Sequence, residues 1–199
     1  MSEKDTIIAT PRPDAAARHA LAERMGAVHL SRVREMPRIE LYLDQVLTLV
    51  AQELAFMQLP GETLLTGSMV NNYVKQGVIP APHKKRYTRR HLASLLFVCA
   101  FKRVFSIAQV KQLMERIYAS GVDLAWLYDE ACALLERSLA ACFSPVSDDE
   151  PVDPAIGGPC GEKDLDPELA RLIEASVASL ATKVYVEQTL LLAAGGASA

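Results

Sequence analysis

Several features that would assign the chain to a familiar class are missing from it. Its four cysteines show none of the close spacings of a zinc site, which favours free thiols in a reducing compartment. No stretch reaches the roughly 18 uninterrupted apolar residues of a transmembrane helix. The charged residues that follow Met1 do not resemble the start of a signal peptide. We therefore expect a cytoplasmic protein with no membrane partner, no bound metal and no cofactor.

Sequence patterns of common catalytic sites are also missing. There is no glycine-rich phosphate loop, no nucleophile elbow and no histidine–carboxylate pair at ligand spacing. His83 and His91 lie among cations, which disfavours a metal ion there. We expect a protein that is not an enzyme.

Half of the 199 residues are hydrophobic, which is ample for a core. Alternating β-branched runs are scarce, so the sequence predicts a mainly α fold. The net charge of −3 is unevenly distributed. The segment 62–116 holds ten Lys and Arg residues against two acidic ones, a net +8, which leaves −11 for the remainder. A basic segment within an acidic chain is typical of a nucleic-acid binder, whereas the plainer interpretation is a solvated charged face.

The segment 64–114 predicts three helices, the first at about 67–76. Thr66 can cap this helix, and Gly77 can end it with a left-handed backbone. Its apolar stripe leaves Ser68, Asn71, Asn72 and Lys75 on the other side, as short polar or basic groups that could meet base edges and phosphates.

A basic, aromatic turn follows, because Pro80 and Pro82 exclude a helix. We expect Lys84, Lys85 and Arg86 to neutralise phosphates from this turn. Tyr87 could bond a phosphate or anchor the turn to the core, and both interpretations stay open. A second helix is predicted at about 89–104, and Ser106 with Gln109 is a capping-box pattern for a third.

Arg89 and Arg90 open the second helix, where the helix dipole disfavours cations. A bound polyanion would offset that conflict, so we include both in the candidate DNA-binding set. The remainder of this helix is apolar or small nearly all round, which predicts burial on more than one side by segments nearer the C-terminus.

This order resembles the winged helix-turn-helix head of MerR-type regulators. The residues that carry the resemblance are Tyr73, Lys75, Gly77, Ile79-Pro80, Arg86-Tyr87, Leu92, Phe97 and Phe105-Ser106. The chain also resembles the bacterial domain of unknown function 1836 over residues 36–116, through the segments 39–45, 69–75 and 79–87. The resemblance implies a MerR-like head that binds double-stranded DNA and regulates transcription. The alternative is a helical protein-interaction module that keeps the winged-helix shape without DNA binding.

The rest of the chain predicts segments around this head. We expect an N-terminal tail and connector at 1–35 with a helix at 15–25, the head at 36–118, a helical extension at 119–143, a flexible acidic loop at 144–166, and a C-terminal helix and tail at 167–199. Within them, we predict a helix at 39–58, a helix or helix pair at 122–142, and a helix at 166–194. Asp166 as cap and Pro167 at the first helical position are typical of the start of the last helix.

The end of the last helix predicts a homodimer. Its apolar residues Tyr185, Val186, Leu190, Leu191 and Leu192 occupy more than one stripe and would leave an exposed patch in a monomer. Packing of these residues against the 39–58 helix of the same chain is the alternative. MerR-type relatives bind two half-sites as dimers, which agrees with the first interpretation.

Overall fold

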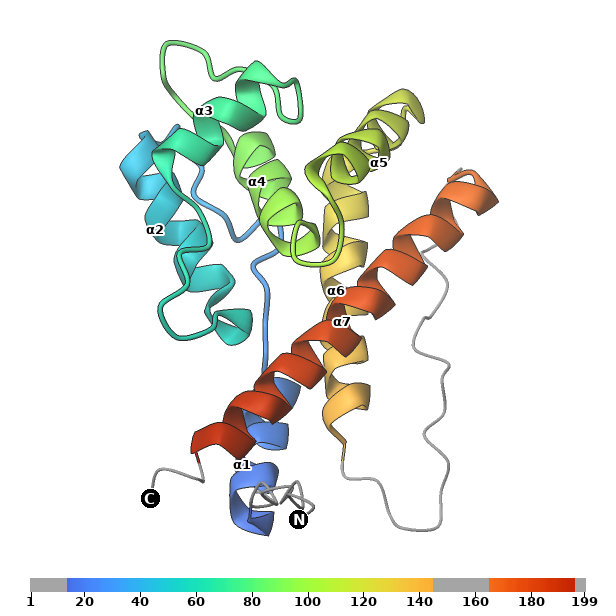
Figure 1. The fold of residues 1–199 in the computed structure, drawn as a ribbon. Helices are drawn as coiled ribbons and strands as arrows, with labels where there is room; N and C mark the ends of the chain where they lie inside the picture. The colour runs from blue at the N-terminus through green and yellow to red at the C-terminus, as the bar shows by residue number, and fades with distance from the viewer. Residues whose placement is uncertain (1–13, 145–164, 196–199) are drawn as a thin grey trace, which may run out of the picture.

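The computed structural model describes residues 14–144 and 165–195, which fold into helices joined by loops (Figure 1). In chain order the elements are α1 (Ala15–Gly26), α2 (Leu43–Glu53), the 3-10 helix η1 (Ala55–Met57), α3 (Gly67–Lys75), α4 (Arg89–Phe101), α5 (Ile107–Ala119), α6 (Leu124–Phe143) and α7 (Pro167–Gly195). These ranges contain no β-strand, only isolated bridges between Leu41 and Tyr87 and between His83 and Arg86. The mainly α prediction is confirmed.

The helix α4 lies at the centre of the fold. Nine of its thirteen residues are buried, among them Leu95, Val98 and Cys99 with no exposed surface. It packs against α2 and α5 and, from the C-terminal part of the chain, against α6 and α7. A helix that lacks a polar face needs neighbours on several sides, as the sequence predicted, and α6 and α7 supply the missing cover.

The helices α6 and α7 form the largest helix pair, with α7 crossing α6 obliquely in Figure 1. Leu139, Leu180 and Val184 are fully buried there. The start of α7 follows the predicted pattern, since Asp166 Oδ2 accepts a hydrogen bond from the Leu169 backbone N–H at 2.9 Å and Pro167 occupies the first turn. The helix α1 packs on α6 through a face that includes Leu21 and Met25.

The helix predicted at 39–58 is shorter than expected at both ends. Leu41 exchanges two backbone hydrogen bonds with Tyr87, of 2.8 and 2.9 Å, and this pairing holds it extended. The Tyr42 backbone N–H donates to Gln45 Oε1 at 2.9 Å, so the helix begins at Leu43. Its last turn tightens into η1. Ile39, expected inside the helix, is 70% exposed.

Other predicted boundaries agree more closely with the structure. The helix predicted at 89–104 ends at Phe101, and the region 122–142 is one continuous helix, α6. Ser106 and Gln109 form the expected capping box of α5. Most of the predicted acidic loop lies outside the described residues, as do the chain ends 1–13 and 196–199.

The connector before α2 is attached to α6 by charged groups. Arg32 Nη2 lies 2.6 Å from Glu136 Oε2, and Glu136 Oε1 accepts the Leu30 backbone N–H at 2.8 Å. Burial alone would raise the pKa of Glu136, but the hydrogen bonds from Arg32 and Leu30 outweigh it and hold the pKa below its usual value. Across residues 14–144 and 165–195, no helix combines the length and apolarity needed to span a membrane.

Candidate nucleic-acid interface

The helix α3 is a short amphipathic helix with defined ends. Thr66 Oγ1 accepts the Met69 backbone N–H at 3.2 Å, which confirms the predicted cap. Gly77 follows the helix at φ 69°, a left-handed conformation that glycine adopts at little cost. Val70 and Tyr73 bury the inner face. These features fix one side of α3 to the core and leave the other free.

The free side of α3 carries all four of the residues predicted there. Ser68, Asn71, Asn72 and Lys75 are each exposed. Figure 1 places α3 and the loop that follows it at one end of the molecule, opposite the C-terminal end of α7. A helix with an exposed face of hydroxyl, amide and ammonium groups can approach a nucleic-acid groove without its core residues moving.

A tight turn at 83–86, which we call the wing turn, presents two lysines. The Arg86 backbone N–H donates to the His83 carbonyl at 2.8 Å, so Lys84 and Lys85 form the two central positions. Their φ angles are 47° and 62°, as in a type I′ turn. Asparagine and glycine are preferred in this conformation, whereas lysine adopts it at a cost. Both lysines are exposed, so their ammonium groups are accessible from solvent.

The remaining residues of this segment anchor the wing turn. Tyr87 is only 4% exposed, pairs with Leu41 through the backbone and meets the His91 ring edge-on with centroids 5.7 Å apart. Burial raises the pKa of Tyr87. Of the two interpretations left open by the sequence, the structure therefore favours the anchor. Arg86 lies over the Tyr42 ring, with Cζ 3.6 Å from the centroid.

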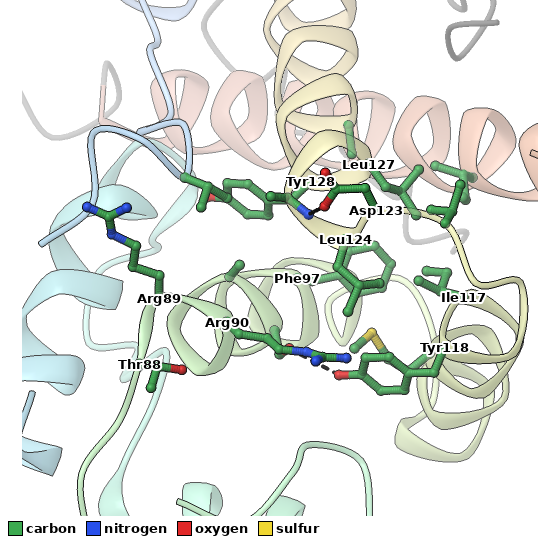
Figure 2. Close-up of a pocket in the computed structure, with 18 of the residues that line it drawn as sticks. Thr88, Arg89, Arg90, Phe97, Ile117, Tyr118, Asp123, Leu124, Leu127 and Tyr128 are labelled. Carbon is green, nitrogen blue, oxygen red and sulfur yellow. Dashed lines mark hydrogen bonds between the residues drawn. The ribbon is translucent and has the colours of Figure 1, made fainter. Parts of the chain in front are cut away.

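Arg89 and Arg90 point away from the wing turn. Arg89 Nε donates to the Pro37 carbonyl at 3.1 Å, and its Nη2 is buried without a hydrogen-bond partner. Arg90 is exposed and extends toward Tyr118 on α5, with Cζ 5.7 Å from the ring centroid. Figure 2 shows the two side chains leaving the start of α4 in different directions. The structure thus does not bring them together with Lys84 and Lys85.

Several cations of the basic segment are paired within the fold. Arg103 donates to Glu62 at 2.7 Å and to Glu187 on α7 at 2.5 Å, with its side chain 5% exposed. Burial lowers the pKa of Lys102, whose ammonium donates to the Leu64 carbonyl. The net charge of +8 counted for the segment 62–116 includes these cations. It takes no account of acidic residues from other segments, such as Glu187 of α7, that pair with them in the fold. Among the described cations of this segment, Lys75 on α3 and Lys84 and Lys85 in the wing turn form no ion pair, and neither do Arg89 and Arg90 at the start of α4.

Tyr42 is a site residue that the pattern analysis did not single out. It is 51% exposed and supports Arg86 from the segment before α2. The sequence does contain a pointer to Tyr42, because this residue lies within the segment 39–45 that carries the family resemblance. Its role depends on the pairing of Leu41 with Tyr87, which joins residues 46 positions apart and leaves no local trace in the sequence.

The comparison with protein families matches residues 31–131 to the family described as Domain of unknown function (DUF1836), just over half of the chain. The match runs from the connector through α2, α3, α4 and α5 into the first part of α6. No curated protein and no solved structure matches the chain significantly. The family resemblance inferred from residues 36–116 is confirmed, and the chain belongs to the DUF1836 family.

Proposed function

We propose that the chain is a DNA-binding transcriptional regulator whose head resembles that of MerR-type proteins. In this proposal α3 enters the major groove and the wing turn contacts phosphates. The observation that carries it is the pair of features at one end of the fold. An exposed polar helix face stands beside a turn that holds two lysines in a strained conformation.

The order of elements supports a winged helix-turn-helix. The extended residue Leu41 precedes α2. The helix α3 and the wing turn follow, and Tyr87 after the turn then pairs with Leu41. The core-forming helix α4 comes next. One departure is the connection between α2 and α3, which spans residues 54–66 and includes η1. This is longer than the three or four residues of a usual helix-turn-helix.

The side chains of the proposed interface divide into two groups. Asn71 and Ser68 stand on the exposed face of α3, where an asparagine amide can bond to adenine through both its donor and its acceptor. Lys75, Lys84 and Lys85 supply charge to phosphates, which positions a protein without specifying sequence. Arg89 and Arg90 are left out of this interface because their side chains are directed elsewhere.

A homodimer formed through α7 is part of the proposal. Eight residues from Leu172 to Leu191 are exposed, and all are uncharged: Leu172, Ala175, Ser179, Thr182, Tyr185, Val186, Leu190 and Leu191. The neighbouring Lys183 is partly exposed and pairs with Glu187. Leu190 is 65% exposed and Val186 48%. A long helix face without charge is suited to pairing with its twin about a two-fold axis. Such pairing would provide two copies of α3 for two half-sites.

The alternative function, a protein-interaction module without DNA binding, is favoured by the same exposed face of α7. The modest net charge of the chain also favours the alternative, whereas the apolar surface of α4 does not, because α6 and α7 cover that surface within the chain. DNA binding therefore remains our principal proposal, since the alternative gives no role to the exposed lysines of the wing turn.

The test is a fluorescence anisotropy titration of the intact protein with a mixed-sequence duplex at two salt concentrations. We expect binding that weakens steeply with salt, because released counterions drive it. Absence of binding at low salt would overturn the proposal and leave the interaction module.

A second titration assigns the two groups of residues. After selection of a preferred duplex, Asn71→Ala should lose about 1–3 kcal/mol on that duplex only, as for a base-edge contact. Lys84→Ala should weaken binding to every sequence alike. Equal losses of Asn71→Ala on preferred and random DNA would contradict a base contact at Asn71.

A further inference from the structure

A cavity of about 720 Å³ opens between α4, α5, α6 and residues 33–40. It lies within the range of roughly 300–1,000 Å³ that small-molecule sites occupy. Figure 2 shows its walls, with Arg90 and Phe97 from α4, Ile117 and Tyr118 from α5, and Leu124 and Leu127 from α6. The proposed interface does not use this space, because α3 and the wing turn do not line it.

Most of the cavity wall is apolar. Phe97, Ile117, Leu124 and Leu127 surround its body, and Met114 adds a thioether. Phe97 and Leu124 are only half-buried although both pack against the core. Such a surface binds an apolar group in preference to water.

One end of the cavity is polar and carries a cation. Ser94 Oγ and Tyr118 Oη lie 3.1 Å apart, and the Arg90 guanidinium lies near the Tyr118 ring. Figure 2 shows Arg90 and Tyr118 on the same side of the cavity, away from Leu127 and Tyr128. One hydroxyl of this pair donates to the other, so one O–H and the Arg90 guanidinium remain as donors of the kind that fixes the head of a ligand.

The charges of this end are unbalanced. In the described part of the chain, Arg90 forms no ion pair with a carboxylate, and its guanidinium lies near the Tyr118 ring. It stands in the first turn of α4, where the helix dipole disfavours a cation. The Asp123 carboxylate also lines the cavity, but it accepts the Ala125 backbone N–H at 2.9 Å as the cap of α6. Arg38 and Glu40 at the wall are both exposed to solvent.

Buried polar groups along the wall also lack partners. Arg89 Nη2 and the Tyr128 hydroxyl are buried without a hydrogen bond of good geometry, and both residues line the cavity. Tyr128 is 9% exposed, and the Cys132 thiol, one turn along α6, is only a weak partner for it. These two groups lie away from Tyr118 in Figure 2, so they line the cavity without belonging to its polar end.

We propose that this cavity binds a small amphipathic anion, a carboxylate on an aliphatic or aromatic body. The carboxylate would lie against Arg90, Ser94 and Tyr118, with its body among Phe97, Leu124 and Leu127. Complementary charge at one end and apolar contact along the rest select this class over neutral or cationic molecules of the same shape.

The test compares three probes with the same body: decanoate, decanol and decylammonium. Isothermal titration calorimetry on the intact protein measures each affinity, and the fluorescence of Trp126, the single tryptophan, provides a second signal from α6. We expect one decanoate per chain, bound about tenfold more tightly than decanol, the size expected for one charge-assisted hydrogen bond. Decylammonium should bind more weakly than decanol.

Two variants locate the site. Arg90→Gln should reduce decanoate affinity to that of decanol and leave decanol unchanged, whereas Arg137→Gln, an exposed arginine on α6 outside the cavity, should change neither. Ala93→Phe, which fills the cavity from α4, should abolish binding of both probes. Ala108→Phe, a matched substitution at an exposed position of α5, should leave the binding of both probes unchanged. Far-UV circular dichroism verifies that both phenylalanine variants fold.

Three results would overturn the proposal. Decanoate could fail to saturate at millimolar concentration, it could bind no better than decanol, or its affinity could be unaffected by Arg90→Gln and Ala93→Phe. If a helix from a second copy filled the cavity instead, Ala93→Phe would convert a dimer into a monomer in light scattering, and no one-to-one binding of decanoate would be seen.

Discussion

Replacing the two central residues of the wing turn should change stability and DNA binding in opposite directions. Lys84 and Lys85 have φ angles of 47° and 62°, a region that costs roughly 1–2 kcal/mol for each non-glycine residue. Asparagine followed by glycine is the preferred pair in a type I′ turn. The double variant Lys84→Asn, Lys85→Gly should therefore relieve strain while removing two positive charges.

The expected gain is modest. Relief at two positions is partly offset by about 0.4–1 kcal/mol, because glycine adds freedom to the unfolded chain. A net gain of about 1–3.5 kcal/mol remains, which corresponds to a rise in Tm of about 2–14 °C for a chain of this length. Differential scanning calorimetry at neutral pH measures this value directly.

The same variant should bind DNA less tightly and depend less on salt. Loss of two phosphate contacts lowers the slope of log affinity against log salt by about 1.8 for each protomer. The variant Lys84→Arg, Lys85→Arg keeps both charges and should preserve the slope. Lys111→Gln on α5 removes one charge outside the interface and should have no effect. The reasoning is refuted if the Asn-Gly variant is less stable than the parent, or if its salt slope is unchanged.

Three further predictions concern stability and assembly. Arg103→Met should lower the free energy of unfolding in urea by about 2 kcal/mol, because the Glu62 and Glu187 carboxylates would lose their buried cationic partner. The loss is limited because both carboxylates keep some contact with solvent. A loss below about 0.5 kcal/mol would contradict a role for this ion pair in holding α7. Burial lowers the pKa of His91, so the unfolded chain binds a proton at a higher pH than the folded chain does. The free energy of unfolding should therefore decrease as the pH drops below about 6.5. In urea unfolding at pH 7.5 and 5.5, this decrease should be smaller for His91→Asn than for the parent protein, and an equal decrease would refute the role of His91. Leu190→Glu should convert a dimer to a monomer in light scattering, whereas Gln112→Glu on α5 should not; a monomeric parent protein at micromolar concentration would remove the dimer from the account.

Local signals predicted the helices well. Thr66, Ser106 with Gln109, and Asp166 with Pro167 each cap the helix that they were expected to cap, because a cap depends on residues within one turn. The apolar surface of α4 also predicted its burial correctly, since periodicity records how many faces a helix hides.

Features that depend on distant residues could not be predicted in the same way. The apolar pattern at 39–58 continues through Ile39 and Leu41, yet Leu41 pairs with Tyr87 and the helix begins only at Leu43. Likewise, the basic segment shows the charge of Arg103 but not its partner Glu187, which lies 84 residues away. Backbone pairing and ion pairs across the fold are set by tertiary packing, which leaves no periodic trace.

The part of the candidate site that depends on local spacing could be predicted, whereas the part that depends on distant residues could not. The exposed face of α3 follows from a helical period, so Ser68, Asn71, Asn72 and Lys75 could be identified from spacing alone. The directions of Arg89 and Arg90 depend on Pro37 and Tyr118, which come from other segments. The cavity they help to line joins five segments of the chain, including Ile173 of α7, and has no sequence pattern of its own.

The most direct test of the central claim is a lysine footprint of the intact protein with and without duplex DNA. Brief acetylation followed by mass spectrometry measures the reactivity of each lysine side chain in one experiment. We predict that DNA protects Lys75, Lys84 and Lys85 and leaves Lys111 on α5 and Lys183 on α7 unchanged, because only the first three lie on α3 and the wing turn. Protection of Lys111 or Lys183 without protection of Lys84 and Lys85, or no protection of any lysine at low salt, would contradict the proposed interface.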